Sequence, residues 1–92
     1  MMSDDAFQIM QEKHVLSIVL YLAENGPSRK SDIYEAVSRG TRMPDKLDGL
    51  ERSGIVRIVN RDGHGPSLIS LTEKGERVGE LVSEIKEMID QS

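Results

Sequence analysis

The sequence contains no cysteine, and this absence excludes three kinds of chemistry. Disulfide bonds, zinc sites built on thiolates and cysteine redox switches all need the thiol group. The two histidines, His14 and His64, are distant in sequence and form no credible metal site without cysteine. Neither a nucleophile paired with a base nor a glycine-rich phosphate loop with a lysine is present. The sequence therefore predicts a protein without cofactors that is not an enzyme.

Long apolar runs are also absent. The longest mostly apolar run covers residues 15–23, whereas a membrane-spanning helix needs about 20 apolar residues. The first residues are acidic and lack the basic flank and apolar core of a signal peptide. No internal repeat, low-complexity tract or linker divides the 92 residues, which suit one compact domain. We expect a single cytoplasmic domain with no membrane partner.

Positive charge is scarce overall but concentrated in the middle of the chain. The formal net charge is −4. Residues 1–27 carry one basic and four acidic residues, and residues 65–92 carry three basic and six acidic residues, so each end has a net charge of −3. Residues 28–64 carry eight basic and six acidic residues, which gives +2. A central positive region suits contact with nucleic acid, although a surplus of two charges also fits an ordinary solvated surface.

Apolar spacing predicts two helices in the first 40 residues. The first covers about residues 14–24 and ends at residues 25–27, where Gly26 and Pro27 stop a helix. An apolar face also precedes it, at Phe7 and Met10, and predicts a helical turn or two upstream. The second helix covers about residues 30–38. Apolar side chains occupy nearly the full circumference of the first helix, so one of its faces needs a second cover.

A third helix is predicted over about residues 41–53. Thr41 is a suitable N-cap, and Pro44 lies in the first turn, where its missing N–H does no harm. Gly54 ends the helix. The positions predicted to be buried, from spacings of four and three residues, are Met43, Leu47 and Leu50.

After residue 54 the spacing of apolar residues changes from that of a helix to that of a strand. β-Branched residues at 55–59 predict one strand, residues 60–66 a turn-rich tip, and residues 68–71 the second strand of a hairpin. Thr72 is expected to cap a final helix, with Glu73 in its first turn. That helix carries an apolar stripe for about two heptads.

The predicted order is helix, helix, helix, strand, strand, helix: a mainly α-helical (α+β) fold with a small β-hairpin. Few residues separate the second and third helices, so the two cross steeply, as in a helix-turn-helix. The hairpin that follows is typical of a wing, which predicts a winged helix-turn-helix domain. Within it we expect an N-terminal extension at residues 1–13, a winged-helix core at 14–71 and a dimerisation helix at 72–92.

Two signatures resemble winged-helix regulators of the MarR and HxlR types. They are residues 47–56 (LDGLERSGIV) and residues 71–75 (LTEKG), and Gly-Pro at 26–27 with Ser-Asp-Ile at 31–33 is similar to the start of the second helix in those proteins. The resemblance covers residues 15–89. It implies that the third helix contacts the major groove, the wing touches DNA and the terminal helices form a dimer. The N-terminal sensing cysteine found in many HxlR-type proteins is absent, so that mechanism is not implied.

On this reading, residues around the third helix and the wing contact DNA. Arg42 suits guanine, whose O6 and N7 match a bidentate guanidinium. Lys46 is one turn further along, and Asp45 opposes phosphate binding but can accept a hydrogen bond from cytosine. Arg29 and Lys30 begin the second helix, where free N–H groups favour a phosphate. The predicted DNA-binding residues are Arg29, Lys30, Thr41, Arg42, Pro44, Asp45, Lys46, Arg61 and His64, with Gly49 as a further candidate.

The apolar stripe of the final helix predicts self-association. The earlier helices and the hairpin already close one small core, and little chain is left to cover the stripe and the outer face of the first helix. The alternative is that the stripe belongs to the core of its own chain. A two-fold dimer would place two third helices about 34 Å apart on palindromic half-sites. The predicted interface residues are Phe7, Met10, Leu16, Leu20, Val78, Leu81, Val82, Ile85, Met88 and Ile89.

These patterns favour a transcriptional regulator that binds double-stranded DNA as a homodimer. Residues 41–53 would enter the major groove, and the wing tip at 60–66 would contact the adjacent groove or the backbone. The alternative is a winged-helix module for protein–protein assembly without DNA, which the acidic total charge and the aspartates of the third helix support. A small-ligand sensor would need a pocket between dimer helices, and the sequence neither shows nor excludes an effector.

Overall fold

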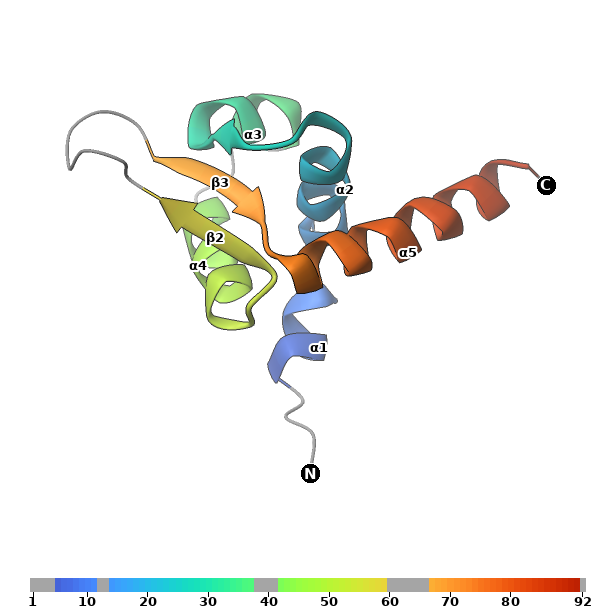
Figure 1. Cartoon of the computed structure of the whole chain (residues 1–92), viewed down its shortest axis with the longest axis horizontal. Helices are drawn as coiled ribbons and strands as arrows, with labels where there is room; N and C mark the ends of the chain where they lie inside the picture. Colours follow the sequence, from blue (N-terminus) through green and yellow to red (C-terminus); the bar gives the residue numbers. More distant parts are fainter. Residues whose placement is uncertain (1–4, 12–13, 38–41, 60–66, 92) are drawn as a thin grey trace.

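The structure is a computed structural model that describes residues 5–11, 14–37, 42–59 and 67–91, with the backbone alone for residues 5–7. The order of elements along the chain begins with two helices and ends with a long one (Figure 1). Their bounds are α1 (Asp5–Met10), α2 (Val15–Asn25), β1 (Ser28–Arg29), α3 (Lys30–Ala36), α4 (Met43–Arg52), β2 (Val56–Val59), β3 (Leu68–Leu71) and α5 (Glu73–Asp90). The expected mainly helical fold with a small antiparallel sheet is confirmed.

One apolar core lies between the helices and the inner face of the sheet. Helix α2 contributes four residues to this core, and α4 contributes three. The three positions of α4 predicted to be buried, Met43, Leu47 and Leu50, are all buried. The core consists of Ile9, Val15, Ile18, Val19, Leu22, Ile33, Met43, Leu47, Leu50, Ile55, Val56 and Ile69.

The sheet has three strands, whereas the sequence predicted a two-stranded hairpin. The strand order is β1-β3-β2, and both pairings are antiparallel. Ser28 pairs with Ile69 and Arg29 with Leu68, so β1 lies along the outer edge of β3. The two residues of β1 are polar and too few to show an alternating pattern, which explains why the prediction missed this strand.

The N-terminal region differs from the prediction in where its helices begin. Helix α1 is separate from α2, and its Ile9 is buried in the core, so the segment expected to be an extension contributes to packing. His14 has a φ of 72°, a left-handed conformation that marks the break before α2. The predicted N-cap Thr41 lies outside the described residues, and Arg42 is the residue that precedes α4.

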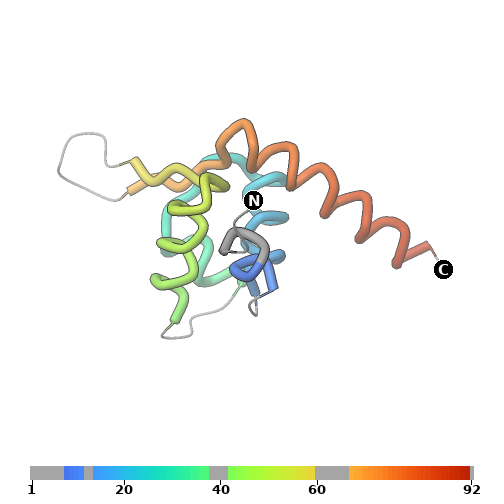
Figure 2. The backbone as a smooth tube through the Cα atoms, turned by 90° about the horizontal axis from the view of Figure 1, so that it is seen from below, coloured from blue at the N-terminus to red at the C-terminus, as the bar shows by residue number. Residues whose placement is uncertain are grey.

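Helix α5 crosses α2 with its first half and extends beyond the rest of the described chain with its second half (Figures 1 and 2). Its buried residues, Gly75 and Gly79, are one turn apart and face the domain. A Cβ on Gly79 would lie 3.1 Å from the Cβ of Ala23, so the two helices are in close contact there. None of the helices that the structure describes is long and apolar enough to cross a membrane.

The end of α4 is closed by its own backbone. Gly54 has a φ of 79°, a conformation that glycine adopts without a Cβ penalty. The Gly54 N–H donates to the Glu51 carbonyl at 3.0 Å, and the Ile55 N–H donates to the Leu50 carbonyl at 2.9 Å. This pair of bonds is a Schellman motif, which satisfies carbonyls that the helix leaves open. The helix therefore stops where the sequence predicted.

The start of α5 is bonded directly to the end of α4. The Thr72 hydroxyl accepts from the Gly75 N–H at 3.0 Å and donates to the Gly54 carbonyl, so it caps α5 and joins it to the connection before β2. The Lys74 Nζ donates to the Ser53 carbonyl at 3.0 Å. Gly75 lies against the Ile55 carbonyl with no room for a Cβ. The two sequence signatures, residues 47–56 and 71–75, thus occur together because they form one junction.

Candidate nucleic-acid interface

Helices α3 and α4 form a helix-turn-helix in which α4 presents one face outward. Residues 38–41, between the two helices, lie outside the described part of the chain. On the inner face of α4, Met43, Leu47 and Leu50 pack in the core. The outer face is exposed, and β2 and β3 extend beside α4 as a ribbon (Figure 1). The exposed side chains of α4 are Pro44, Asp45, Asp48, Glu51 and Arg52.

The outer face of α4 carries more negative than positive charge, unlike a surface that binds only phosphate groups. Three of its exposed side chains are carboxylates and one is a guanidinium. Exposed Arg42 precedes the helix and adds a second cation. Lys46, in contrast, is half-buried, so it stands to the side of this face. The carboxylates can accept hydrogen bonds from base edges, such as cytosine N4, but repel phosphates.

Gly49 does not face outward, and its candidacy for DNA contact is wrong. The residue is buried, and a Cβ at this position would lie 2.7 Å from Cδ1 of Ile9. Helix α1 covers this side of α4, because Ile9 packs over the space that the absent side chain leaves. The sequence prediction did not include α1 as a neighbour of α4, and this is the reason for the error.

The predicted phosphate site at the start of α3 is already occupied by the chain itself. The Arg29 N–H donates to Oδ2 of Asp32 at 3.4 Å, so a carboxylate takes the place that an anion would have. Arg29 is exposed at the end of β1, and Lys30 is half-buried at the first residue of α3. Their side chains still supply positive charge near the ribbon, because Arg29 pairs with Leu68 of β3.

The sequence reasoning missed Arg57. This residue lies in β2 opposite Ser70 of β3, and its side chain is exposed while its neighbour Val56 is buried. The available signal was one basic residue between two apolar ones, Val56 and Ile58, since successive side chains of a strand point to opposite faces. Arg57 and Arg29 therefore belong to the outer face of the sheet, at the base of the ribbon.

Three further predicted DNA-binding residues, Thr41, Arg61 and His64, lie outside the described residues. Their predicted roles remain predictions. The ribbon that carries the last two is described up to Val59 and again from Ser67.

Helices α3 and α4 also interact electrostatically through a tyrosine. Tyr34 of α3 packs partly buried against the core. Burial raises the pKa of its phenol above the ordinary 10.0, and the nearby carboxylate of Asp48 raises it further. The phenol is therefore neutral next to the acidic face of α4.

The residues predicted to form a dimer interface divide into two groups. Val78 and Met10 are partly buried against the core of their own chain, and Leu20 and Val82 are half-buried. For Phe7 only the backbone is described. The remaining side chains keep large exposed fractions: Leu16 47%, Leu81 49%, Ile85 56%, Met88 72% and Ile89 66%.

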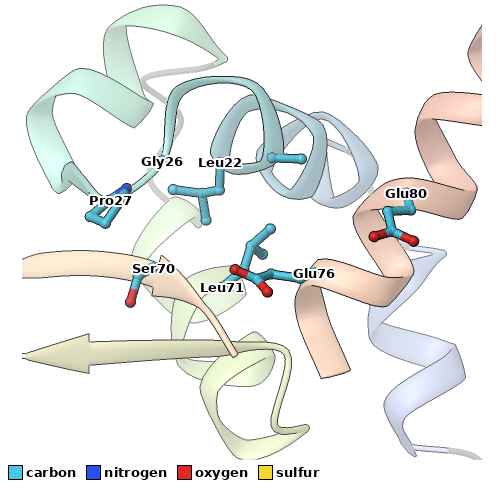
Figure 3. Close-up of a pocket in the computed structure, with 8 residues that line it drawn as sticks. Leu22, Gly26, Pro27, Ser70, Leu71, Glu76 and Glu80 are labelled. Atoms are coloured by element: carbon cyan, nitrogen blue, oxygen red, sulfur yellow. The ribbon is translucent and has the colours of Figure 1, made fainter. Parts of the chain in front are cut away.

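A hollow lies next to the first turns of α5, between α2 and β3 (Figure 3). Its volume is about 460 Å³, and Leu22, Pro27 and Leu71 form much of its apolar wall. Glu76 and Glu80 of α5 point toward it from one side (Figure 3). Carboxylates at this position oppose an anionic ligand, so the hollow is not an extension of a phosphate-binding surface.

Three solved structures illustrate the similarity of the fold. NadR in complex with 4-hydroxyphenylacetate matches with a TM-score of 0.75 and 24% identity over 95% of this chain and 64% of its own. AbfR bound to DNA matches with a TM-score of 0.62 and 26% identity over 88% of this chain and 62% of its own. A transcriptional regulator homologue from Pyrococcus horikoshii matches with a TM-score of 0.64 and 21% identity over 97% of both chains.

This chain thus spans less than two thirds of the length of NadR and AbfR. No protein-family model and no curated protein matches the sequence. The third of these neighbours is itself described as a transcriptional regulator homologue. The chain therefore has the winged helix-turn-helix fold of MarR-type transcriptional regulators.

Proposed function

We propose that this protein is a transcriptional regulator that binds double-stranded DNA as a homodimer. Helix α4 would enter the major groove, and the ribbon of β2 and β3, with its tip at residues 60–66, would contact the adjacent groove or the backbone. Arg42 and Arg52 would supply cations next to the bases, with Arg29 and Arg57 at the base of the ribbon.

The observation that carries this proposal is the exposed outer face of α4 beside the ribbon of β2 and β3. The width of the major groove admits one α-helix, and a slim two-stranded ribbon fits next to it. A structural neighbour of 26% identity, AbfR, has been solved with DNA bound, which supports DNA as the ligand of this arrangement.

Selection of bound sequences from a random DNA pool is the decisive experiment. We expect enrichment of a palindrome whose half-sites are about one helical turn apart. On the selected site, Arg42→Ala should reduce the affinity by about 1–3 kcal/mol, with a smaller effect on unrelated DNA. Removal of one phosphate-contacting cation, such as Arg57→Ala, should lower the slope of log affinity against log salt by about 0.9.

Lys74→Ala is a suitable control, because its ammonium group lies at the junction of α4 and α5 and bonds to Ser53. Like Arg42→Ala, this variant removes one positive charge, but at a site that is not on the outer face of α4. Equal losses for Lys74→Ala and Arg42→Ala would show that net charge alone governs binding and would contradict the assigned face.

A specific observation favours the alternative, a protein-binding module. The exposed side chains of α4 include Asp45, Asp48 and Glu51, and such a face suits a basic partner. Asp48→Asn separates the two functions. For DNA, the variant should bind non-specific duplex about two- to threefold more tightly at low salt, as expected for one exposed charge. A pool without any enriched sequence, for both the parent and the variant, would favour the protein-binding function.

A further inference from the structure

The first turn of α4 holds a carboxylate that the helix does not use for its own capping. Asp45 is exposed and is the third residue of α4. Asp32 is the third residue of α3, and there Oδ2 accepts from the Arg29 N–H, so that carboxylate is used by its own helix. Arg42, before α4, has φ −91° and ψ 2° instead of the extended backbone of Arg29, and among the described residues no such bond joins it to Asp45. The Asp45 carboxylate is therefore available to a ligand.

The other two exposed carboxylates of α4 are less well placed to contact a base. Asp48 interacts electrostatically with the Tyr34 phenol of α3. Glu51 lies at the end of α4, where its carbonyl accepts from the Gly54 N–H. A helix that lies in the major groove contacts base edges mainly with the residues at its N-terminal end. Within the described part of α4, Asp45 is the acidic residue of that end.

Cytosine is the base whose major-groove edge matches an ionised carboxylate. A carboxylate only accepts hydrogen bonds. In the major groove cytosine presents the N4 amino group as a donor and no acceptor, whereas guanine presents two acceptors, thymine presents O4, and adenine presents the acceptor N7 next to its amino group. At each of these three bases a carboxylate would face an acceptor. An asparagine amide both donates and accepts, and it matches adenine instead.

We infer that Asp45 determines a cytosine at one position of each DNA half-site, beside the guanine that suits Arg42. The inference rests on the proposed function for DNA as the ligand and on the free, exposed carboxylate for the choice of base. Arg42 and Asp45 are three residues apart, so their side chains lie close enough to contact neighbouring base pairs. The same carboxylate repels phosphates, so it weakens binding to unrelated duplex while it selects cytosine.

Asp45→Asn provides the test, because it changes the matching base from cytosine to adenine and keeps the shape of the side chain. Selection from a random DNA pool is carried out with the parent and with the variant, and both selected duplexes are then measured with both proteins. We expect the two duplexes to differ by cytosine against adenine at one position of each half-site. The parent should prefer its own duplex by about 5- to 100-fold per half-site, and the variant should prefer the other.

Asp48→Asn is the matched control, since it removes the same charge about one turn further along α4, next to Tyr34. It should raise the affinity for every duplex without changing the preferred base. Asp45→Ala is a second variant, whose side chain neither donates nor accepts. It should lose the preference for cytosine without gaining one for adenine. Because the Asp45 side chain is exposed, both of its variants should keep the circular dichroism minimum of the parent.

Three results overturn the inference. They are an unchanged preferred base for Asp45→Asn, the same change of base for Asp48→Asn, or a weaker guanine preference as the sole effect, which would mean that Asp45 only orients Arg42. Each of them leaves the proposed function intact, because the parent still selects a sequence. A pool in which the parent enriches no sequence contradicts the proposed function, and the inference fails with it.

Discussion

Gly75 illustrates how a single residue determines the approach of two helices. Its Cα lies over the backbone between α4 and β2, and a Cβ would be placed 1.9 Å from the Ile55 carbonyl oxygen. That oxygen also accepts from the Thr72 N–H at 3.0 Å, so it is fixed in place by the fold. A backbone atom cannot move aside as the end of a side chain does. Position 75 therefore admits glycine alone at the observed distance.

We accordingly expect Gly75→Ala to destabilise the domain, although alanine is the better helix former. The overlap with backbone should cost about 3 kcal/mol or more, since even milder overpacking costs 1–3 kcal/mol. Urea unfolding followed by circular dichroism measures the change. Gly79→Ala is the control, because its Cβ would lie 3.1 Å from a side-chain atom of Ala23 and should cost less. An equal or smaller loss for Gly75→Ala would contradict the contact.

At the scale of elements, the first turn of α5 depends on Thr72. Its side chain is the acceptor for the Gly75 N–H and a donor to the Gly54 carbonyl, so one hydroxyl serves both the helix and the junction. Thr72→Ala should reduce the free energy of unfolding by about 1–2 kcal/mol, the usual value of an N-cap. Thr72→Ser keeps the hydroxyl and should recover most of this loss. If alanine and serine unfold at the same urea concentration, the hydroxyl makes no contribution.

The elements differ in how well the sequence predicted them. The helices α2 and α4, the strand β3 and the cap at Thr72 follow from apolar period and cap residues, which are local signals. The strand β1 and the burial of Gly49 do not, because each depends on a distant segment: β3 in one case and α1 in the other. Arg57 was accessible to the same local reasoning, from its place between Val56 and Ile58.

The predicted interface residues divided for a related reason. The stripe of α5 was visible in the sequence over its whole length, but the point at which α5 leaves α2 was not. The structure places that point near Leu81, so Val78 belongs largely to the core and Ile85 to the exposed surface. Which charged side chains of α4 are exposed likewise depends on the side of α4 that α1 covers, and the sequence alone does not show that side.

At the scale of the whole molecule, a small core makes stability sensitive to association. A domain of this size buries a limited fraction of its surface. If two copies associate, unfolding is coupled to dissociation, and the midpoint of thermal unfolding should rise with protein concentration. Calorimetry over a hundredfold range of concentration measures this shift. An Ile85→Asp variant should show a midpoint independent of concentration, and a constant midpoint for the parent protein would contradict self-association.

Helix α5 is long and, within the described chain, is bonded to the connection after α4 only at its first turn. Its 18 residues correspond to about 27 Å, and it is held at its first turn, where Thr72 and Lys74 donate to the carbonyls of Gly54 and Ser53, directly after α4. A tilt of roughly 10° about this junction would displace the far tip of α5 by about 5 Å, whereas the end of α4 next to the junction would move by only a small fraction of that distance. The far end of α5 is therefore the part of the described chain whose position would be most sensitive to a change in the geometry of this junction.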